Sequence, residues 1–266
     1  MSQTTKMLMP DAEGFEEAAK ILASGGLVAF PTETVYGLGG DARNDHAVAR
    51  IFEAKGRPRF NPLIVHVPDV ETARDYVEWS DQADRLASAF WPGPLTLVLP
   101  VKTAAGLSPL VTADLPTVAI RVPAHPVARR LLQTFGGPVA APSANPSGRI
   151  SPTEAAHVTA GLSGRIEAIL DGGACDVGVE STILGLADGP TLLRPGGLPQ
   201  EAVEKALCQP LTRHGASDPL TAPGQMTSHY APGAPVRLNV IDPRPDERLL
   251  GFGPVECDLN LSETGD

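Results

Sequence analysis

Cysteine is scarce in this chain of 266 residues. Cys175, Cys208 and Cys257 are far apart, and no Cys-x-x-Cys pair occurs. A disulfide framework and a thiolate zinc site are therefore both disfavoured. The six histidines are scattered, with no pair at the spacing of metal ligands, so we expect no metal site built from protein side chains.

Long apolar runs and the best-known nucleotide and hydrolase motifs are also missing. No apolar stretch approaches the ~20 residues of a membrane helix, and residues 1–17 contain no apolar core of a secretory signal. We therefore expect a cytoplasmic protein with no membrane partner. No Gly-x-x-x-x-Gly-Lys-Ser/Thr and no Gly-x-Ser-x-Gly occurs, which argues against a P-loop enzyme and a serine hydrolase of the nucleophile-elbow type.

Charge is unevenly distributed along the chain. Lys and Arg number 21 against 31 Asp and Glu, a net charge of −10, which disfavours nucleic-acid binding by bulk charge. Yet residues 54–68 and 115–153 contain no acidic side chain, although both segments contain Arg. Either window alone is compatible with a chance gap, but together they favour a pocket for a small polyanion such as a nucleotide.

Short apolar runs alternate with amphipathic stretches, which predicts an α/β fold with a twisted, open, mixed and mostly parallel sheet and flanking helices. The expected strands are 27–30, 63–67, 95–99, 118–122, 139–141, 168–170, 182–186 and 191–193. The expected helices are 13–23, 45–54, 70–79, 82–89, 126–135, 152–160 and 199–207. Gly136 is expected to end one helix in the left-handed conformation, and residues 151–154 (Ser-Pro-Thr-Glu) to form a capping box.

The amino-acid composition changes after residue 207. We expect a folded domain over residues 13–207 and an extended linker over 208–235, which is rich in Pro, Gly, Ser and Thr. Residues 236–266 are interpreted as the incomplete start of a C-terminal domain, with one strand over 235–242, because so short a segment cannot bury a core of its own.

Three loops each follow an expected strand or helix end. Residues 31–39 (Pro-Thr-Glu-Thr-Val-Tyr-Gly-Leu-Gly) bring hydroxyls and a carboxylate together, or form a turn closed by local Thr hydrogen bonds. Their Gly-x-Gly-x-x-Ala also weakly resembles a dinucleotide fingerprint. Residues 55–63 (Lys-Gly-Arg-Pro-Arg-Phe-Asn-Pro-Leu) hold three cations suited to phosphate, although cations also cap helices. Residues 141–148 (Ala-Pro-Ser-Ala-Asn-Pro-Ser-Gly) offer Ser143 and Asn145 to a ligand, or form an ordinary turn.

Taken in order, these motifs resemble the YrdC-like threonylcarbamoyl-AMP synthases. Lys55-x-Arg57 and Ser143-x-Asn145 look like the family signature, and residues 180–182 (Glu-Ser-Thr) and 193–197 (Leu-Arg-Pro-Gly-Gly) also match. Residues 223–224 (Pro-Gly) and 229–232 (His-Tyr-Ala-Pro) resemble the linker of the long form, with the second domain truncated here.

The resemblance implies a YrdC-like fold and a nucleotidyltransferase that makes threonylcarbamoyl-AMP and pyrophosphate from L-threonine, bicarbonate and ATP. The product serves N6-threonylcarbamoyladenosine modification of tRNA beside the anticodon. By resemblance, Lys55 and Arg57 are catalytic, and Mg²⁺ accompanies ATP. The implied threonine-binding residues are Thr34, His66, Arg121, Ala141 and Ser181. The implied ATP-binding residues are Lys55, Arg57, Asn61, Thr117, Ser143, Asn145, Ser151, Arg194 and Tyr230.

The same resemblance implies that the product passes to a tRNA-modifying transferase complex, and we expect no stable complex with nucleic acid. The alternative is a non-catalytic RNA-binding module that uses the same concave face, or a small-molecule sensor. A bound ligand would stabilise the fold under each of these hypotheses. Only detection of the product can therefore distinguish between them.

Overall fold

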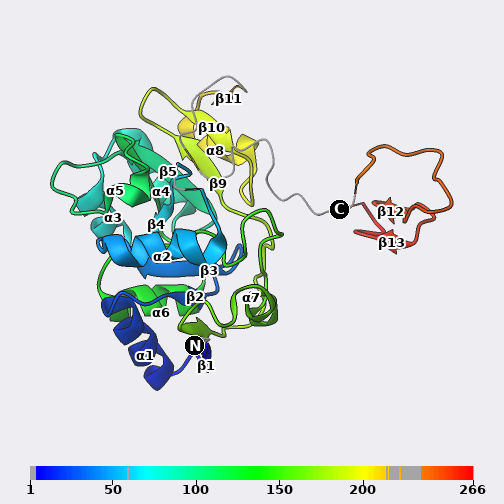
Figure 1. Ribbon diagram of the computed structural model, residues 1–266. Coiled ribbons are helices and arrows are strands. Elements are labelled where there is room, and N and C mark those ends of the chain that lie inside the picture. The colour runs from blue at the N-terminus through cyan, green and yellow to red at the C-terminus, as the bar shows by residue number, and fades with distance from the viewer. Residues whose placement is uncertain (1–3, 59, 214, 216–221, 223–234, 266) are drawn as a thin grey trace. The chain divides into compact units, whose positions relative to one another are not determined.

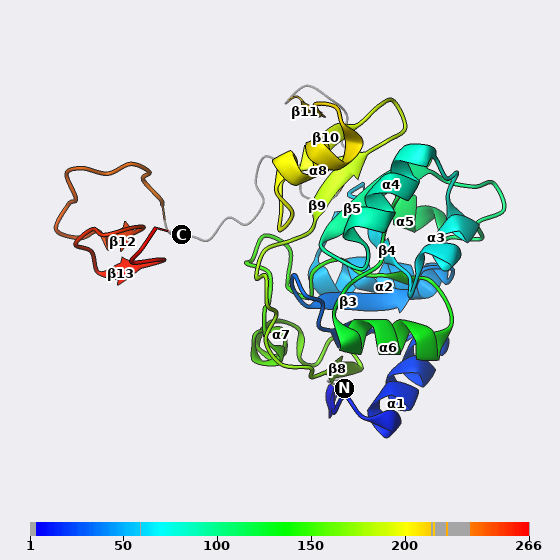
Figure 2. The same cartoon turned by 180° about the vertical axis from the view of Figure 1, so that it is seen from behind.

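The computed structural model describes residues 4–58, 60–213, 215, 222 and 235–265. The chain divides into two compact units, Met1–Ala231 and Pro232–Asp266. Figures 1 and 2 show the elements of each unit from two sides. Within the described ranges, no helix combines the length and the apolar character needed to span a membrane.

The larger unit is built on one sheet, for which eleven strands are described. Their order across the sheet is β1-β8-β2-β3-β7-β4-β6-β5-β9-β10-β11. The strands are β1 (Lys6–Leu8), β2 (Val28–Phe30), β3 (Gly37–Asp41), β4 (Ile64–His66), β5 (Leu95–Pro100), β6 (Thr117–Arg121), β7 (Val139–Ala140), β8 (Ala168–Leu170), β9 (Thr182–Gly185), β10 (Thr191–Arg194) and β11 (Thr212–Arg213).

The sheet is mixed, as predicted, but parallel pairs are not in the majority. The ten neighbouring pairs divide into five parallel and five antiparallel. Short connections without a helix, such as those from β2 to β3 and from β9 to β10, produce antiparallel neighbours, because a parallel pair needs a long crossover. The sheet also extends into the segment expected as linker, since β11 pairs with β10.

Helices cover the sheet on both sides. They are α1 (Ala12–Ala23), α2 (Asp45–Lys55), α3 (Val70–Tyr76), α4 (Asp81–Phe90), α5 (Pro109–Thr112), α6 (Pro126–Phe135), α7 (Ala155–Leu162) and α8 (Gln200–Leu207). Asp11 and Asn44 cap α1 and α2 by accepting backbone N–H groups, and α6 ends at Gly136 in the left-handed conformation, as predicted.

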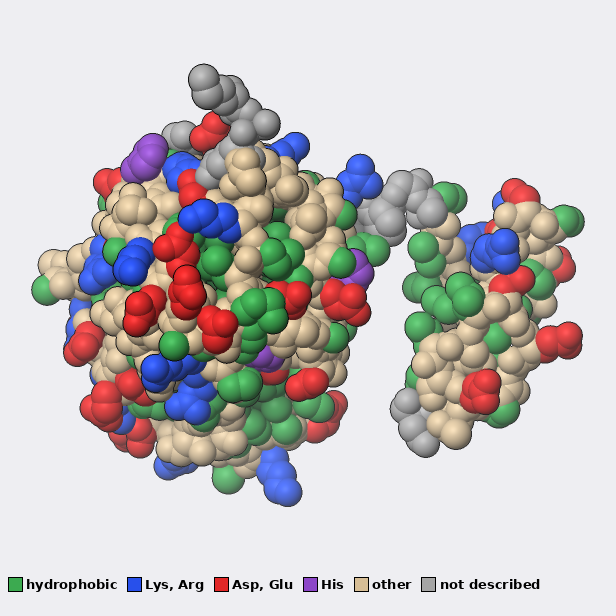
Figure 3. Space-filling view, turned by 90° about the horizontal axis from the view of Figure 1, so that it is seen from below, with side chains coloured by type: hydrophobic (Ala, Val, Ile, Leu, Met, Phe, Trp, Pro, Cys, Tyr) green, Lys and Arg blue, Asp and Glu red, His purple; other side chains and the backbone are tan. Residues whose placement is uncertain are grey.

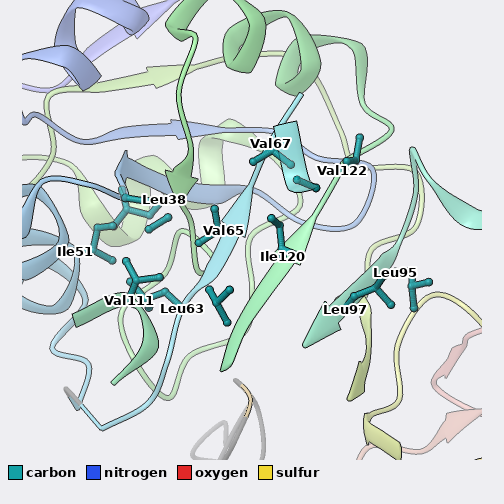
Figure 4. Close-up of a cluster of buried hydrophobic side chains, with 14 of the residues drawn as sticks. Leu38, Ile51, Leu63, Val65, Val67, Leu95, Leu97, Val111, Ile120 and Val122 are labelled. Carbon is teal, nitrogen blue, oxygen red and sulfur yellow. The ribbon is translucent and has the colours of Figure 1, made fainter. Parts of the chain in front are cut away.

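Alternate residues of the central strands point to opposite sides of the sheet, and the site lies on one of these sides. Leu63, Val65 and Ile120 belong to a large cluster packed beneath helices, part of which Figure 4 shows. The opposite side of the same strands contributes Ile64, Ala119, Val98 and Ile183 to a small cluster completed by Ala222. Among the described residues, that small cluster contains no helix side chain, so no described helix covers this half of the face.

The glycine-rich strand β3 was missed by the sequence analysis. It pairs antiparallel with β2, and a Cβ at Gly39 would lie 2.8 Å from Phe30 Cε1 and 2.9 Å from Val139 Cγ1. Glycine therefore allows the close approach of neighbouring side chains. Because these glycines form a strand and no strand-to-helix turn, the weak dinucleotide interpretation is wrong.

Two local predictions are also wrong. The helix expected over 152–160 begins at Ala155, and its N-cap Glu154 makes no capping hydrogen bond through its side chain. The Ser151 hydroxyl instead donates to a carboxylate oxygen of Glu180, so no capping box forms. In the smaller unit, residues 235–242 form no strand, and the described strands are β12 (Leu250–Gly251) and β13 (Leu259–Asn260), a parallel pair.

Candidate functional site

A pocket opens on the helix-free half of the sheet face. Its walls come from the loop after β2, the carboxyl ends of β4 and β6, the loop after β7 and the residues around β9 and β10. It is lined by Thr32, Thr34, Val35, Gly37, Arg57, Ile64, His66, Arg121, Ala141, Pro142, Ser143, Glu180, Ser181 and Arg194. Strands β4 and β6 are parallel neighbours, so His66 and Arg121 lie side by side where both strands end.

One side of the pocket gathers the residues expected to bind threonine. Thr34, His66, Arg121, Ala141 and Ser181 all line it. They come from five segments that are far apart in the sequence, and only the sheet brings them together. The Ser181 hydroxyl lies 2.8 Å from the Thr96 hydroxyl of the neighbouring strand, which holds this side chain against the pocket wall.

Arg121 is the central cation on this side and is 3% exposed. It donates from Nε to Gly93 O (3.2 Å), from Nη1 to Thr34 Oγ1 (3.0 Å) and from Nη2 to Glu33 Oε1 (2.6 Å). The other oxygen of Glu33 accepts the Ala124 backbone N–H at 3.0 Å. The buried charges are therefore paired, which a buried ion requires.

His66 is buried beside Arg121 and packs edge-on against the Phe30 ring, with 6.2 Å between ring centroids. Burial, assisted by the charge of Arg121, lowers the pKa of His66 to about 3. The imidazole is therefore neutral at physiological pH and can exchange a hydrogen bond with a ligand without adding charge.

The other side of the pocket contains Arg57, Ser143 and Arg194 of the expected ATP-binding residues. Arg57 donates to Asn61 O (3.3 Å) and Pro62 O (2.9 Å), which orients its guanidinium. Arg194 donates from Nε and Nη2 to Ser181 O, at 3.1 and 2.8 Å. Two guanidinium groups at one wall suit an anionic ligand.

Lys55 and Asn145 lie behind this wall and are buried. Lys55 Nζ donates to Ser143 O and Asn145 O, each at 2.5 Å, and so joins the loops of the two signature motifs. Burial lowers the pKa of Lys55 well below its usual range, and the charge of Arg57 lowers it further. Asn145 Nδ2 donates to Pro146 O and Arg149 O, which closes its own turn.

Four expected ATP-binding residues remain. Asn61 is buried, and its backbone oxygen accepts from Arg57. Ser151 donates to Glu180, which lines the pocket. Thr117 begins β6 on the same strand face as Arg121 but is not among the lining residues. Tyr230 lies outside the described residues.

Two acidic residues of the site were missed as functional positions. Glu33 and Glu180 both stood in motifs noted in the sequence, but nothing in their local spacing indicated their partners. Glu33 pairs with a residue 88 positions away, and Glu180 with one 29 positions away. In the described part of the chain, no group of three or more His, Cys, Asp or Glu side chains could hold a metal ion.

Comparison with known proteins identifies the family of this fold. A family profile named Sua5/YciO/YrdC, described as "Telomere recombination", matches residues 20–196. The chain belongs to this family. It is 50% identical over 240 residues to a threonylcarbamoyl-AMP synthase of Bacillus subtilis, covering 88% of this chain and 69% of that protein. It is 49% identical over 225 residues to the Pyrococcus abyssi synthase, covering 82% and 66%. It thus spans about two thirds of the length of these relatives.

Solved structures of the Sua5/YciO/YrdC family agree with the fold. The structure of Pyrococcus abyssi Sua5 complexed with L-threonine superposes with a TM-score of 0.83 at 44% identity, covering 95% of this chain and 73% of that one. Escherichia coli YciO superposes with a TM-score of 0.67 at 23% identity, covering 76% and 100%, and shows the shared fold alone. The predicted YrdC-like α/β fold is thereby confirmed.

Proposed function

We propose that this chain is a threonylcarbamoyl-AMP synthase, which makes threonylcarbamoyl-AMP and pyrophosphate from L-threonine, bicarbonate and ATP. The names of its relatives support this activity. The observation that carries it is a single pocket lined both by the five residues expected to bind threonine and by three of those expected to bind ATP. The two substrates must meet for the reaction to occur.

The chemistry requires no covalent nucleophile from the protein. The threonine amine and bicarbonate combine to a carbamate with loss of water. A carbamate oxygen then forms a bond to the α-phosphorus of ATP, and the bond from that phosphorus to the bridging oxygen breaks as pyrophosphate leaves. The protein must hold two mutually repelling anions in line and stabilise the charge that moves to pyrophosphate.

Different residues of the pocket bind the phosphates and the amino acid. Arg57 and Arg194 offer positive charge to the phosphates, and Ser143 offers a hydroxyl. Lys55 holds the loops of Ser143 and Asn145 in place through two backbone carbonyls. On the other side, Thr34, His66, Arg121 and Ser181 hold threonine. Because hydrogen bonds hold several of these side chains in place, they are preorganised to orient the substrates.

Mg²⁺ is expected to accompany ATP. The lining offers cations and a single carboxylate, Glu180, which suits an ion held mainly by phosphate oxygens and water. When bound, the ion would neutralise part of the triphosphate charge. We also propose that the product passes to a tRNA-modifying transferase, where it serves N6-threonylcarbamoyladenosine formation.

Nothing described favours the alternative of an RNA-binding module. Figure 3 shows acidic and basic side chains interspersed on the face of the larger unit that it presents, with no continuous basic stripe. The cations of the site are largely buried in a pocket, where a folded RNA backbone has no access.

The test is threonine-dependent release of pyrophosphate from labelled ATP in the presence of bicarbonate and Mg²⁺. The proposal expects release that requires all three substrates and a product with the mass of threonylcarbamoyl-AMP. Folded protein that binds ATP but releases no pyrophosphate on addition of threonine would refute it.

A further inference from the structure

The carboxylate of Glu33 has no role in the mechanism above, although it lies directly behind the threonine side of the pocket. It is 7% exposed and makes two contacts, one to the Arg121 guanidinium (2.6 Å) and one to the Ala124 backbone N–H (3.0 Å). It is not among the lining residues, so a ligand would meet Arg121 and not Glu33.

The hydrogen bonds of Arg121 leave a defined set of donors for a ligand. A guanidinium has five N–H groups, one on Nε and two on each terminal nitrogen. Gly93 O takes the donor on Nε, Thr34 Oγ1 takes one on Nη1, and Glu33 Oε1 takes one on Nη2. Within the described residues, each terminal nitrogen therefore keeps one N–H that can donate to a ligand carboxylate.

The plane of this guanidinium depends on its three acceptors. Gly93 O and Thr34 Oγ1 are neutral acceptors, and Glu33 is the charged partner of Arg121 among the described residues. Glu33 is itself held by the Ala124 N–H, which follows β6 by three residues. A rigid chain of contacts therefore runs from the backbone through Glu33 to the two remaining donors of Arg121.

The charge of Arg121 is balanced by Glu33 at contact distance. A paired guanidinium can still hydrogen-bond the single charge of a carboxylate.

We propose that Glu33 is a positioning residue for the amino-acid substrate: it orients Arg121 for recognition of the threonine carboxylate. This inference rests on the proposed function and adds to it a residue that acts through Arg121 without touching the substrate.

The test compares Glu33→Gln with Glu167→Gln. Glu167 makes the same pair of contacts elsewhere in the fold, with Arg50 at 2.7 Å and the Leu27 backbone N–H at 2.7 Å, so it controls for the loss of an ion pair as such. For Glu33→Gln we expect the KM for threonine to rise at least tenfold, while the KM for ATP changes less than threefold. Glu167→Gln is expected to change neither.

Titration calorimetry with L-threonine and with L-threonine amide measures the preference for the carboxylate. A purely structural role of Glu33 would leave this preference unchanged. The wild type is expected to bind threonine at least tenfold more tightly than the amide, and Glu33→Gln to lose most of that preference. If Glu33→Gln does not fold, Glu33→Asp keeps the charge but is too short for both contacts, and the same selective loss is expected. Equal losses for threonine and ATP, or an unchanged preference for threonine over its amide, would overturn the inference. An inactive wild type would instead refute the proposed function.

Discussion

The side-chain nitrogen of Lys55 lies 2.5 Å from the backbone oxygen of Asn145, 90 residues further along the chain. It makes a second contact of equal length to Ser143 O. The lysine of one signature motif therefore holds the backbone of the other. This relationship gives Lys55 a structural role that neither motif indicates alone.

We expect Lys55→Ala to abolish threonine-dependent pyrophosphate release and also to lower the free energy of unfolding by about 3 kcal/mol. The second effect follows because two buried carbonyls lose their hydrogen-bond donor. Pyrophosphate release and urea unfolding followed by circular dichroism would measure the two effects.

Lys102→Ala is the matched control, since Lys102 Nζ donates to Arg74 O at 2.7 Å outside the pocket. It is expected to cost about 1 kcal/mol of stability and to leave turnover unchanged. Full activity in the Lys55 variant would contradict the proposed role of this lysine in organising the site.

Arg57→Ala is expected to lower kcat/KM for ATP at least a hundredfold, while the affinity for threonine changes less than threefold. Arg57 lines the pocket and its guanidinium is oriented by two carbonyls, so its loss removes a preorganised cation from the phosphate side. Steady-state kinetics with each substrate varied in turn would show the difference.

Arg57→Lys is not expected to restore activity, because an ammonium cannot reproduce the planar fork. Arg130→Ala serves as the control, since Arg130 lies exposed on α6 within an acid-free segment. Equal losses in the Arg57 and Arg130 variants would indicate a general effect of charge and contradict a specific role for Arg57.

The fold could be predicted from the sequence wherever hydrophobic periodicity and capping residues agreed. The helix over Pro126–Phe135 and the strand over Ala168–Leu170 have the expected bounds. Strand β3 was missed because three of its five residues are glycine, which is depleted in strands. Glycine is present here because neighbouring side chains approach the backbone closely. The smaller unit lacked a periodic pattern that could indicate its two short strands.

The site was predictable in its residue types and less so in its contacts. Acid-free segments indicated an anion pocket, and both contribute lining residues, Arg57 from one and Arg121 from the other. The acidic partners could not be found in this way. Glu33 and Glu180 reach their partners only through the folded sheet, and local spacing contains no information about contacts between distant segments.

The Ser151 hydroxyl, expected to cap a helix, donates to Glu180 instead, and a double-mutant cycle would detect this. We expect Ser151→Ala to lower the free energy of unfolding by about 1–2 kcal/mol in the wild type and by almost nothing in a Glu180→Ala background, because the two side chains lose the same interaction.

Asn44→Ala provides the contrast of a true cap. Asn44 Oδ1 accepts from the His46 and Ala47 backbone N–H groups at 3.0 and 3.2 Å, and its loss is expected to cost about 1 kcal/mol in either background. An undiminished effect of Ser151→Ala when Glu180 is absent would show that Ser151 acts through another group.

His66 should make the stability of the protein depend on pH below neutrality. Its folded-state pKa of about 3 lies below the value of about 6.5 for an unfolded histidine. Between these two values the unfolded chain binds more protons, so the free energy of unfolding falls as the pH is lowered. From pH 7 to pH 5 the loss due to His66 is expected to be about 2 kcal/mol.

Urea unfolding at the two pH values would measure this loss. In His66→Gln, which cannot titrate, the decrease between pH 7 and pH 5 should be about 2 kcal/mol smaller than in the wild type. His46→Gln, at an exposed position on α2, is the control for replacing a histidine by glutamine. If the free energy of unfolding fell equally with pH in the wild type and in His66→Gln, the lowered folded-state pKa of His66 would be contradicted.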